Sequence, residues 1–269
     1  MSTSILNTLN INHHLSFVHY NVQSILTKLD ILHAELLEFD ILAFSETWLS
    51  TATPTDDLVL PSYNIERRDR VGDRYGGLIV YIKEGLHYRR RKDLEPLHTE
   101  CLWIELANSQ KHILFGLFYR PPNSDSIYYS SIEDSFNLAV DTGIRDIIVT
   151  GDFNFNLFNQ QTSRKIESLC NQFALFQSID EATHFTETSS SLLDLILVSN
   201  KDHLLLSGVA DPFLHQDIRY HCPVYGIFKF SKPKQKSFTR HIWKYDQGDY
   251  DLLRTKAAST DWTTLYDDD

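Results

Sequence analysis

A strand-length apolar run that ends in a short polar motif constrains this chain more than any other stretch. Residues 145–154 run from Arg145 through five largely apolar positions to Gly151, Asp152, Phe153 and Asn154. A continuous apolar run bounded by turn residues indicates a buried strand. If the backbone stays extended, Asp152 and Asn154 point to the same side at the end of the sheet. A carboxylate beside an amide suits activation of water next to an oxyanion such as phosphate, although both residue types are also common in turns.

Other segments predict a mixture of strands and helices. Helices are expected at 126–140, at 162–173 and at 24–38, the last with Ser24 as its N-cap. Further strands are expected at 15–22, 40–45, 76–82, 102–106, 113–119, 192–199 and 224–230. Because hairpins alternate with strand–helix–strand units, the pattern favours two stacked mixed sheets covered by helices.

Composition bounds the class of protein. No apolar run reaches membrane-spanning length and the first residues lack a secretory pattern, so we expect an intracellular protein with no membrane partner. The three cysteines, Cys101, Cys170 and Cys222, are widely spaced and are interpreted as small buried hydrophobic residues. We expect a tail at 1–14, one domain at 15–230, and a basic linker with a connector at 231–269.

The net charge of −11 disfavours a nucleic-acid partner at first sight. Its distribution is uneven, since Arg67, Arg68, Arg70 and Arg74 form one basic cluster and residues 89–92 form another. Such clusters are usually solvated faces, so they support phosphate contacts only weakly.

Polar residues lie just past the ends of several expected strands, where rigid scaffolds present chemistry. They are Asn21, Glu46, Tyr119, Asp152, Asn154, Asp194 and His221. Each alone has an ordinary structural interpretation as a turn, cap or core residue. The motifs around these residues and their order along the chain favour a functional site. In sequence order the motifs are Asn-Val-x-Ser, Glu-Thr-Trp-Leu, Tyr-Arg-Pro-Pro, Gly-Asp-Phe-Asn, Ser-Leu-Leu-Asp-Leu-Ile and His-Cys-Pro-Val.

In these motifs the chain resembles the endonuclease/exonuclease/phosphatase superfamily, which includes DNase I. The Glu-Thr-Trp-Leu and Tyr-Arg-Pro-Pro spellings are similar to endonuclease domains of LINE-type non-LTR retrotransposons. The resemblance covers about residues 15–230 and implies a four-layer α/β/β/α sandwich, with two mixed β-sheets flanked by helices. Residues 240–269 are similar to the connector toward a reverse transcriptase, which does not follow here, so a truncated copy or a fragment of such a polyprotein is expected.

The resemblance also implies roles for the site residues. Glu46 would bind Mg²⁺, or Mn²⁺ as an alternative, with Asn21 close to the ion. Asp152 would orient and deprotonate the attacking water, while Asn154 and Tyr119 would hold the scissile phosphate. His221 would stabilise charge on the phosphoryl oxygens, and Asp194 would hold its imidazole.

One departure from the family pattern concerns the metal site. The family commonly has Ser-Asp-His before a proline, whereas this chain has Arg219, Tyr220, His221, Cys222 and Pro223. Tyrosine is neutral at pH 7, so a carboxylate is lost, and we expect weakened metal binding unless Asp217 substitutes.

Three functions remain open from the sequence. The first is a Mg²⁺-dependent endonuclease that nicks one DNA strand and leaves a 3′-hydroxyl, for which nuclear access is expected. The second is a phosphatase of the same superfamily acting on a small phosphoester. The third is a truncated copy with weak activity or none, retained as a nucleic-acid-binding domain. The sequence specifies neither a target DNA sequence nor an oligomeric state.

Overall fold

The computed structural model describes residues 13–72, 75–214, 219–232 and 248–262. The strands are β1 (Leu15–Asn21), β2 (Ile41–Ser45), β3 (Tyr63–Arg68), β4 (Leu78–Lys83), β5 (His87–Arg90), β6 (Glu100–Ala107), β7 (His112–Tyr119), β8 (Asp146–Asp152), β9 (Phe176–Gln177), β10 (His184–Thr186), β11 (Ser190–Ser191), β12 (Asp194–Val198), β13 (Leu204–Val209), β14 (Arg219–His221) and β15 (Val224–Phe228). The α-helices are α2 (Leu29–Leu36), α3 (Ser126–Asp141), α4 (Gln160–Phe173) and α5 (Tyr250–Ser259). Short 3₁₀ turns are η2 (Leu26–Lys28), η3 (Thr55–Leu58), η4 (Lys92–Leu94) and η5 (Lys201–His203).

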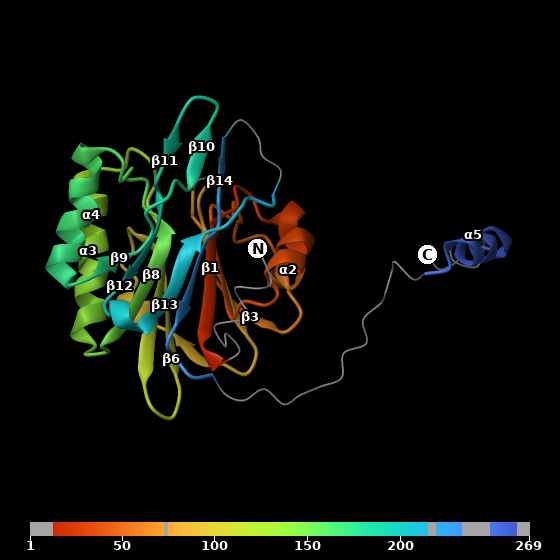
Figure 1. Ribbon diagram of the computed structural model, residues 1–269, viewed down its shortest axis with the longest axis horizontal. Helices are drawn as coiled ribbons and strands as arrows, with labels where there is room; N and C mark the ends of the chain where they lie inside the picture. Colours follow the sequence, from red (N-terminus) through yellow and green to blue (C-terminus); the bar gives the residue numbers. More distant parts are fainter. Residues whose placement is uncertain (1–12, 73–74, 215–218, 233–247, 263–269) are drawn as a thin grey trace. The chain divides into compact units, whose positions relative to one another are not determined.

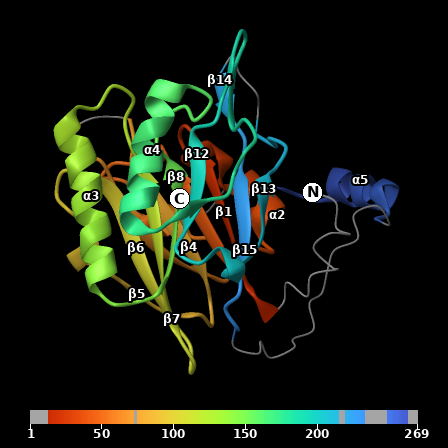
Figure 2. The same ribbon diagram turned by 60° about the vertical axis from the view of Figure 1, so that its left-hand side comes forward.

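Within these residues, two six-stranded sheets form the centre of the fold, in the orders β13-β15-β1-β2-β4-β3 and β5-β6-β7-β8-β12-β9. Both are mixed, because β1 pairs parallel with β2 and β7 parallel with β8 among otherwise antiparallel pairs. Helices α3 and α4 cover the second sheet, and α2 covers the first (Figure 1). The expected α/β/β/α sandwich, the DNase I-like fold, is confirmed. A small sheet, β11-β10-β14, protrudes at one end (Figures 1 and 2).

Alternation along β1 separates the two cores. Leu15 and Phe17 belong to the apolar cluster between the sheets, whereas Val18 and Tyr20 belong to the cluster under α2. Successive side chains of a strand point to opposite faces. Asn21 therefore continues the inter-sheet face, at the point where the apolar core gives way to polar residues.

The predicted start of the first helix is wrong. Ser24 has a φ of 80° and does not cap a helix; α2 begins at Leu29, and its N-cap, Lys28, makes no side-chain capping bond. The reason is tertiary, because the backbone N–H of Ser24 donates to the carbonyl of Glu46 at 2.8 Å. The charged strands β3 and β5 and the short strands β9, β10, β11 and β14 were also not predicted, since such sequences carry a weak periodic signal. The six-residue strand β13, with the uncharged sequence Leu-Leu-Leu-Ser-Gly-Val, was missed as well.

The chain divides into two compact units, residues 1–234 and 235–269. In the second unit, α5 is capped by the Asp249 side chain, which accepts from the backbone N–H of Leu252 at 2.9 Å. The tail, the linker and the connector remain predictions, because residues 1–12, 233–247 and 263–269 lie outside the described ranges. Across the ranges described, no helix is both long and apolar enough to cross a membrane.

Candidate active site

Glu46 lies in a strained loop that directly follows β2. Glu46 and Trp48 adopt left-handed backbone conformations, with φ of 52° and 54°, which cost non-glycine residues about 1–3 kcal/mol each. The loop is held because Thr47 and Trp48 donate their backbone N–H groups to the carbonyls of Gly77 and Gly76, at 3.3 and 2.9 Å. A Cβ at position 77 would lie 2.6 Å from the Thr47 hydroxyl, so this approach requires glycine.

The carboxylate of Glu46 accepts hydrogen bonds from three side chains. Asn21 Nδ2 and the Tyr119 hydroxyl donate to its Oε1 at 2.9 and 3.0 Å, and Trp48 Nε1 donates to its Oε2 at 3.2 Å. Asn21 Nδ2 also donates to Asp152 Oδ2 at 2.9 Å. Burial and the charges of Glu46 and Asp152 raise the pKa of Tyr119, so its hydroxyl stays protonated. Asn21 thus bridges carboxylates contributed by the two sheets.

Asp152 ends β8 at a position that only glycine can precede. A Cβ on Gly151 would lie 1.9 Å from the carbonyl oxygen of Phe118 on β7, and its φ of 147° is disfavoured for other residues. This close approach lets β7 and β8 run side by side to their ends, where Tyr119 is in register with Asp152. The strand pairing therefore brings the phenol and the carboxylate to the same edge.

The backbone does not stay extended from Asp152 to Asn154, so the condition under which their side chains would point to the same side is not met. β8 ends at Asp152, and Asn154 is left-handed, with a φ of 50°. Its backbone N–H donates to Asp152 Oδ1 at 2.9 Å, which is an Asx-type turn. Its side-chain Nδ2 donates to the carbonyl of Arg120 at 2.9 Å. Asn154 thus lies beside Asp152, but through a turn rather than through strand alternation.

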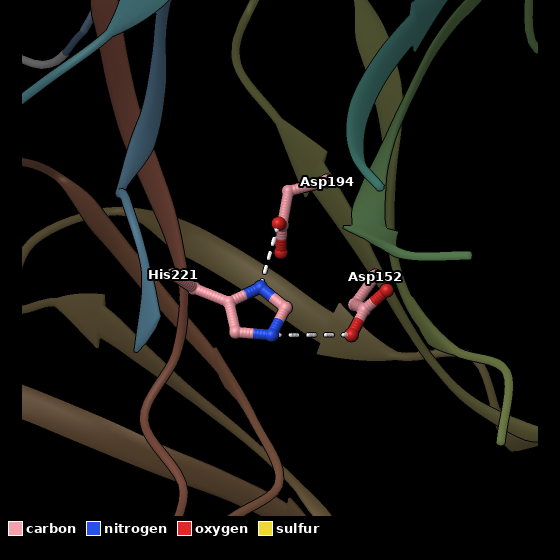
Figure 3. Close-up of side chains that lie close together, drawn as sticks. All are labelled: Asp152, Asp194 and His221. Carbon is pink, nitrogen blue, oxygen red and sulfur yellow. Dashed lines mark hydrogen bonds and ion pairs between the residues drawn. The ribbon is translucent and has the colours of Figure 1, made fainter. Parts of the chain in front are cut away.

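His221 lies between two buried aspartates (Figure 3). Asp194 and Asp152 face each other in the antiparallel β12–β8 register, and they are 0% and 1% exposed. His221 Nδ1 is 2.8 Å from Asp194 Oδ2, and its Nε2 is 4.0 Å from Asp152 Oδ2. The fold brings Asp152, Asp194 and His221 together with the four other site residues expected from the sequence. Those four are Asn21, Glu46, Tyr119 and Asn154.

The pKa values of the buried groups follow from this arrangement. Burial and the charge of Asp194 raise the pKa of Asp152 to about 7. Burial alone would lower the pKa of His221, but the charge and hydrogen bond of Asp194 outweigh it and raise that pKa to about 9. Burial opposes ionisation of Asp194, yet the charge of His221 holds the pKa of Asp194 below its usual range. At neutral pH the site therefore contains an ion pair beside a carboxylate that titrates near neutrality, which suits a proton acceptor.

The donor set fits a divalent cation. Ligand atoms of Asp152, Asp194 and His221 lie within 4.8 Å of one another, but an imidazolium hydrogen-bonded to a carboxylate is not a metal ligand. The oxygens of Glu46 and Asp152 are the more suitable ligands for a hard ion, and three carboxylates around one imidazolium leave negative charge for a cation to balance. Asn21 turns its Nδ2 toward both carboxylates, so as a ligand it would offer its Oδ1.

Three residues at the site carried no signal in the motifs. His19 on β1 is fully buried, its Nε2 lies 3.0 Å from the hydroxyl of Ser45, and burial lowers its pKa to about 4. The hydroxyl of Thr183 accepts from the backbone N–H of Asp194 at 2.9 Å. The ring of His184 lies 4.7 Å from that of His221. Of the three, only His19 could have been found from the sequence, because it precedes Asn21 by two positions and therefore lies on the same face of the strand.

Tyr220 is turned away from the face of β14 that carries His221. In the β10–β14 register Tyr220 pairs with Phe185 and His221 with His184. The rings of Tyr220 and Phe185 stack at 5.4 Å with an interplanar angle of 16°. Asp217, the residue expected to substitute for a lost carboxylate, lies outside the described residues.

The arginine clusters form an ion-pair network rather than a free cationic face. Arg68 on β3 donates to the carbonyls of Cys101 and Pro96, at 2.9 and 2.8 Å, and thereby links the edge strand of the first sheet to β6 of the second. The remaining partners are Asp69 for Arg67, Glu100 for Arg70, Glu105 for Arg89, Glu95 for Arg90, and Asp93 and Glu105 for Arg91. Because their charges are paired with carboxylates, these arginines do not support phosphate contacts. Arg74 lies outside the described residues.

Comparisons with known proteins identify the family. The family model described as Endonuclease/Exonuclease/phosphatase family matches residues 8–239, and no curated protein matches the chain. The endonuclease domain of TRAS1, a telomere-specific non-LTR retrotransposon, is 13% identical with a TM-score of 0.64, over 80% of this chain and 98% of that domain.

Two further solved structures share the fold. The 3′ phosphatase NExo from Neisseria, bound to product DNA hairpin, is 15% identical with a TM-score of 0.60, and an AP endonuclease from Archaeoglobus fulgidus is 16% identical with a TM-score of 0.57. Each match covers 80% of this chain and 100% of the other. Since the family model spans most of the sequence and the fold agrees, the chain belongs to the endonuclease/exonuclease/phosphatase family.

Proposed function

We propose that the chain is a divalent-metal-dependent phosphodiesterase that nicks one strand of DNA and leaves a 3′-hydroxyl. One observation carries the proposal, namely that side chains spread over two hundred residues form a single, mostly buried cluster, which is joined by hydrogen bonds and by the contact of His221 with Asp152 at 4.0 Å. Its members are Asn21, Glu46, Tyr119, Asp152, Asp194 and His221. In-line attack on a phosphodiester needs a proton acceptor, donors to the phosphoryl oxygens and charge stabilisation, and this cluster supplies each type.

Each residue has a role in that reaction. Asp152, whose pKa is raised to about 7, accepts the proton of the attacking water. His221 remains an imidazolium through its hydrogen bond with Asp194 and stabilises charge on the phosphoryl oxygens. Tyr119 would donate to the scissile phosphate after its hydroxyl turns from Glu46 Oε1, and Asn154 would donate the amide proton that does not reach the Arg120 carbonyl. A bound Mg²⁺ or Mn²⁺ would be held by Glu46, with Asn21 beside it, and would supply further stabilisation of the developing negative charge.

The partner proposed is DNA in a retroelement setting. The endonuclease domain of a non-LTR retrotransposon and a phosphatase bound to a DNA hairpin share the fold. A parent polyprotein with a reverse transcriptase, and nuclear access when active, follow from this proposal, since the 3′-hydroxyl would prime DNA synthesis on the chromosome.

A plasmid-nicking assay tests the proposal. Supercoiled plasmid should be relaxed by the chain with Mg²⁺ and left intact in EDTA. Asp152→Ala and Glu46→Ala should each remove the activity. The matched control is Asp146→Asn, at the opposite end of β8 and about 20 Å from Asp152, which should nick like the wild type. Nicking that survives either alanine substitution, or that ignores EDTA, would exclude the proposal.

A phosphatase is the second candidate, favoured by the shared fold of the 3′ phosphatase NExo. The two functions are separated by offering plasmid, a 3′-phosphorylated oligonucleotide and a soluble phosphoester to the same preparation. Nicking of plasmid alone supports the endonuclease. Phosphate release without nicking supports the phosphatase, and binding of DNA without either reaction supports an inactive copy.

Position 220 gives a further discrimination. The sequence suggests that Tyr220→Asp would restore a metal ligand. Because Tyr220 stacks on Phe185, on the face opposite to His221, we instead expect Tyr220→Asp to bring no gain in nicking at limiting Mg²⁺. A clear gain in nicking at limiting Mg²⁺ would show that a carboxylate at position 220 does contribute to metal binding.

A further inference from the structure

Two buried polar atoms beneath the site face each other without a hydrogen-bond partner. They are Nδ1 of His19 and Oδ1 of Asp194, which lie 3.6 Å apart. Both side chains are 0% exposed. Leaving a buried donor or acceptor unsatisfied costs about 1–3 kcal/mol, so two such atoms side by side indicate an interaction rather than two separate defects.

The distance indicates a direct contact. A water bridging two groups holds them about 5 Å apart, so 3.6 Å leaves no space for one. A movement of about 0.7 Å closes the gap to a normal hydrogen bond. The oxygen concerned is the free one of the pair, because Asp194 Oδ2 is engaged by His221 at 2.8 Å.

The other ring nitrogen decides the tautomer. His19 Nε2 lies 3.0 Å from the hydroxyl of Ser45, which is also fully buried. A hydroxyl can donate or accept, whereas a carboxylate oxygen can only accept. For a neutral ring the arrangement is therefore satisfied throughout only when Nδ1 carries the proton and Nε2 accepts from Ser45. The opposite tautomer would set a nitrogen lone pair against the carboxylate.

We propose that His19 is a positioning residue for the Asp194–His221 pair, as the Nδ1–H tautomer that donates to Asp194 Oδ1 while Ser45 donates to Nε2. This inference rests on the proposed function of the same site. His19 links the end of β2, next to Glu46, to Asp194 in the opposite sheet. With one imidazole on each oxygen, the Asp194 carboxylate cannot rotate, and the ring of His221 is held in place.

Two conservative variants separate positioning from simple packing. The amide nitrogen of asparagine occupies the place of Nδ1, so His19→Asn keeps the donor to Asp194 and gives up the contact with Ser45. The longer His19→Gln places its amide at Nε2, so it keeps the contact with Ser45 and loses the donor to Asp194. For plasmid nicking we expect kcat within about threefold of wild type for His19→Asn and a loss of about tenfold or more for His19→Gln. KM should change little in either variant, and the two variants should have the same melting temperature.

Side-chain nitrogen NMR of the full chain labelled with ¹⁵N-histidine supplies a readout that needs no activity. The signal that disappears in the His19 variants should report the Nδ1–H tautomer in the wild type. The Nδ1 proton resonance of His221 should shift in His19→Gln and stay in place in His19→Asn. An Nε2–H tautomer, or equal losses of kcat in both variants, would overturn the inference. A wild type that nicks no DNA would refute the proposed function, while the tautomer and the His221 resonance would still decide the role of His19.

Discussion

Replacing Asp152 with asparagine is expected to make the metal-free protein more stable at pH 8 while removing its activity. If the site carboxylates were exposed around a metal ion, replacing one of them would have little effect on the melting temperature. In the structure Asp152 is 1% exposed and lies opposite Asp194 in the β8–β12 register. A buried carboxylate beside another one opposes folding unless a cation balances it.

The magnitude follows from the pKa of this carboxyl, which burial and the charge of Asp194 raise to about 7. Above pH 7 an ionised carboxyl of this kind lowers the free energy of unfolding by about 4 kcal/mol relative to an ordinary aspartate. Asparagine removes that penalty but weakens the hydrogen bonds with Asn21 and Asn154, at about 1 kcal/mol each. The net gain is about 2 kcal/mol, which raises the melting temperature by about 4–8 °C for a domain of this size.

The sign of the pH dependence is also determined. The folded-state pKa of Asp152 lies above the unfolded-state value, so the penalty is absent at acid pH, grows as pH rises toward 7 and is constant above it. In thermal melts in EDTA at several pH values from 5 to 8.5, the melting temperature of the variant minus that of the wild type should increase up to about pH 7 and stay constant above it. Added Mg²⁺ should narrow the difference, because it stabilises the wild type more.

Asp146 at the other end of β8 provides the control, since it is also buried but is paired with Lys111 at 2.9 Å and His203 at 2.8 Å. Asp146→Asn should therefore lower the melting temperature. If Asp152→Asn melts at or below the wild-type temperature in EDTA at pH 8, or if its advantage is the same at pH 5, the electrostatic account of this site is wrong.

Three further outcomes are expected. The rate of nicking should rise with pH as Asp152 ionises, at a pH below the pKa of about 7 that it has without a cation, and should fall as His221 loses its proton near 9; a rate that does not fall there would contradict the role of His221. Trp48→Phe removes the indole donor to Glu46 Oε2 and should raise the Mg²⁺ concentration needed for half-maximal nicking about tenfold, with kcat at saturating Mg²⁺ nearly unchanged. Gly151→Ala should destabilise the fold by more than about 4 kcal/mol, because its Cβ would overlap a carbonyl oxygen of β7; soluble protein with a near-normal melting temperature would show that the two strands can separate there.

Much of the scaffold could be predicted from local patterns. The strands β7 and β8 contain continuous apolar runs whose bounding turns are visible in the sequence, and the apolar stretch of β6 is interrupted only by Glu105. The helices α3 and α4 were predicted to within two residues, and Asp125 and Asn159 cap them through their side chains. Ser24 shows the limit of such reasoning, since a good capping residue was overridden by a hydrogen bond to a loop distant in sequence.

The site residues themselves were found because their types and order were informative, but their contacts were not. Asn21 and Asp152 are 131 positions apart, yet one amide nitrogen joins Asp152 to Glu46. His19 carried no motif, and the arginine clusters looked like a free basic surface until their carboxylate partners on neighbouring strands were placed.

The amino-acid order by itself determined which segments are buried strands, which family the chain resembles and which polar groups stand at strand ends, because these follow from spacing along one segment. Only the tertiary structure decided how deeply Asp152 and Asp194 are buried, which proton each group holds and which imidazole faces which oxygen. Those properties depend on solvent exclusion and on charges a few ångströms away, and such neighbours are contributed by strands that meet only when the two sheets pack together.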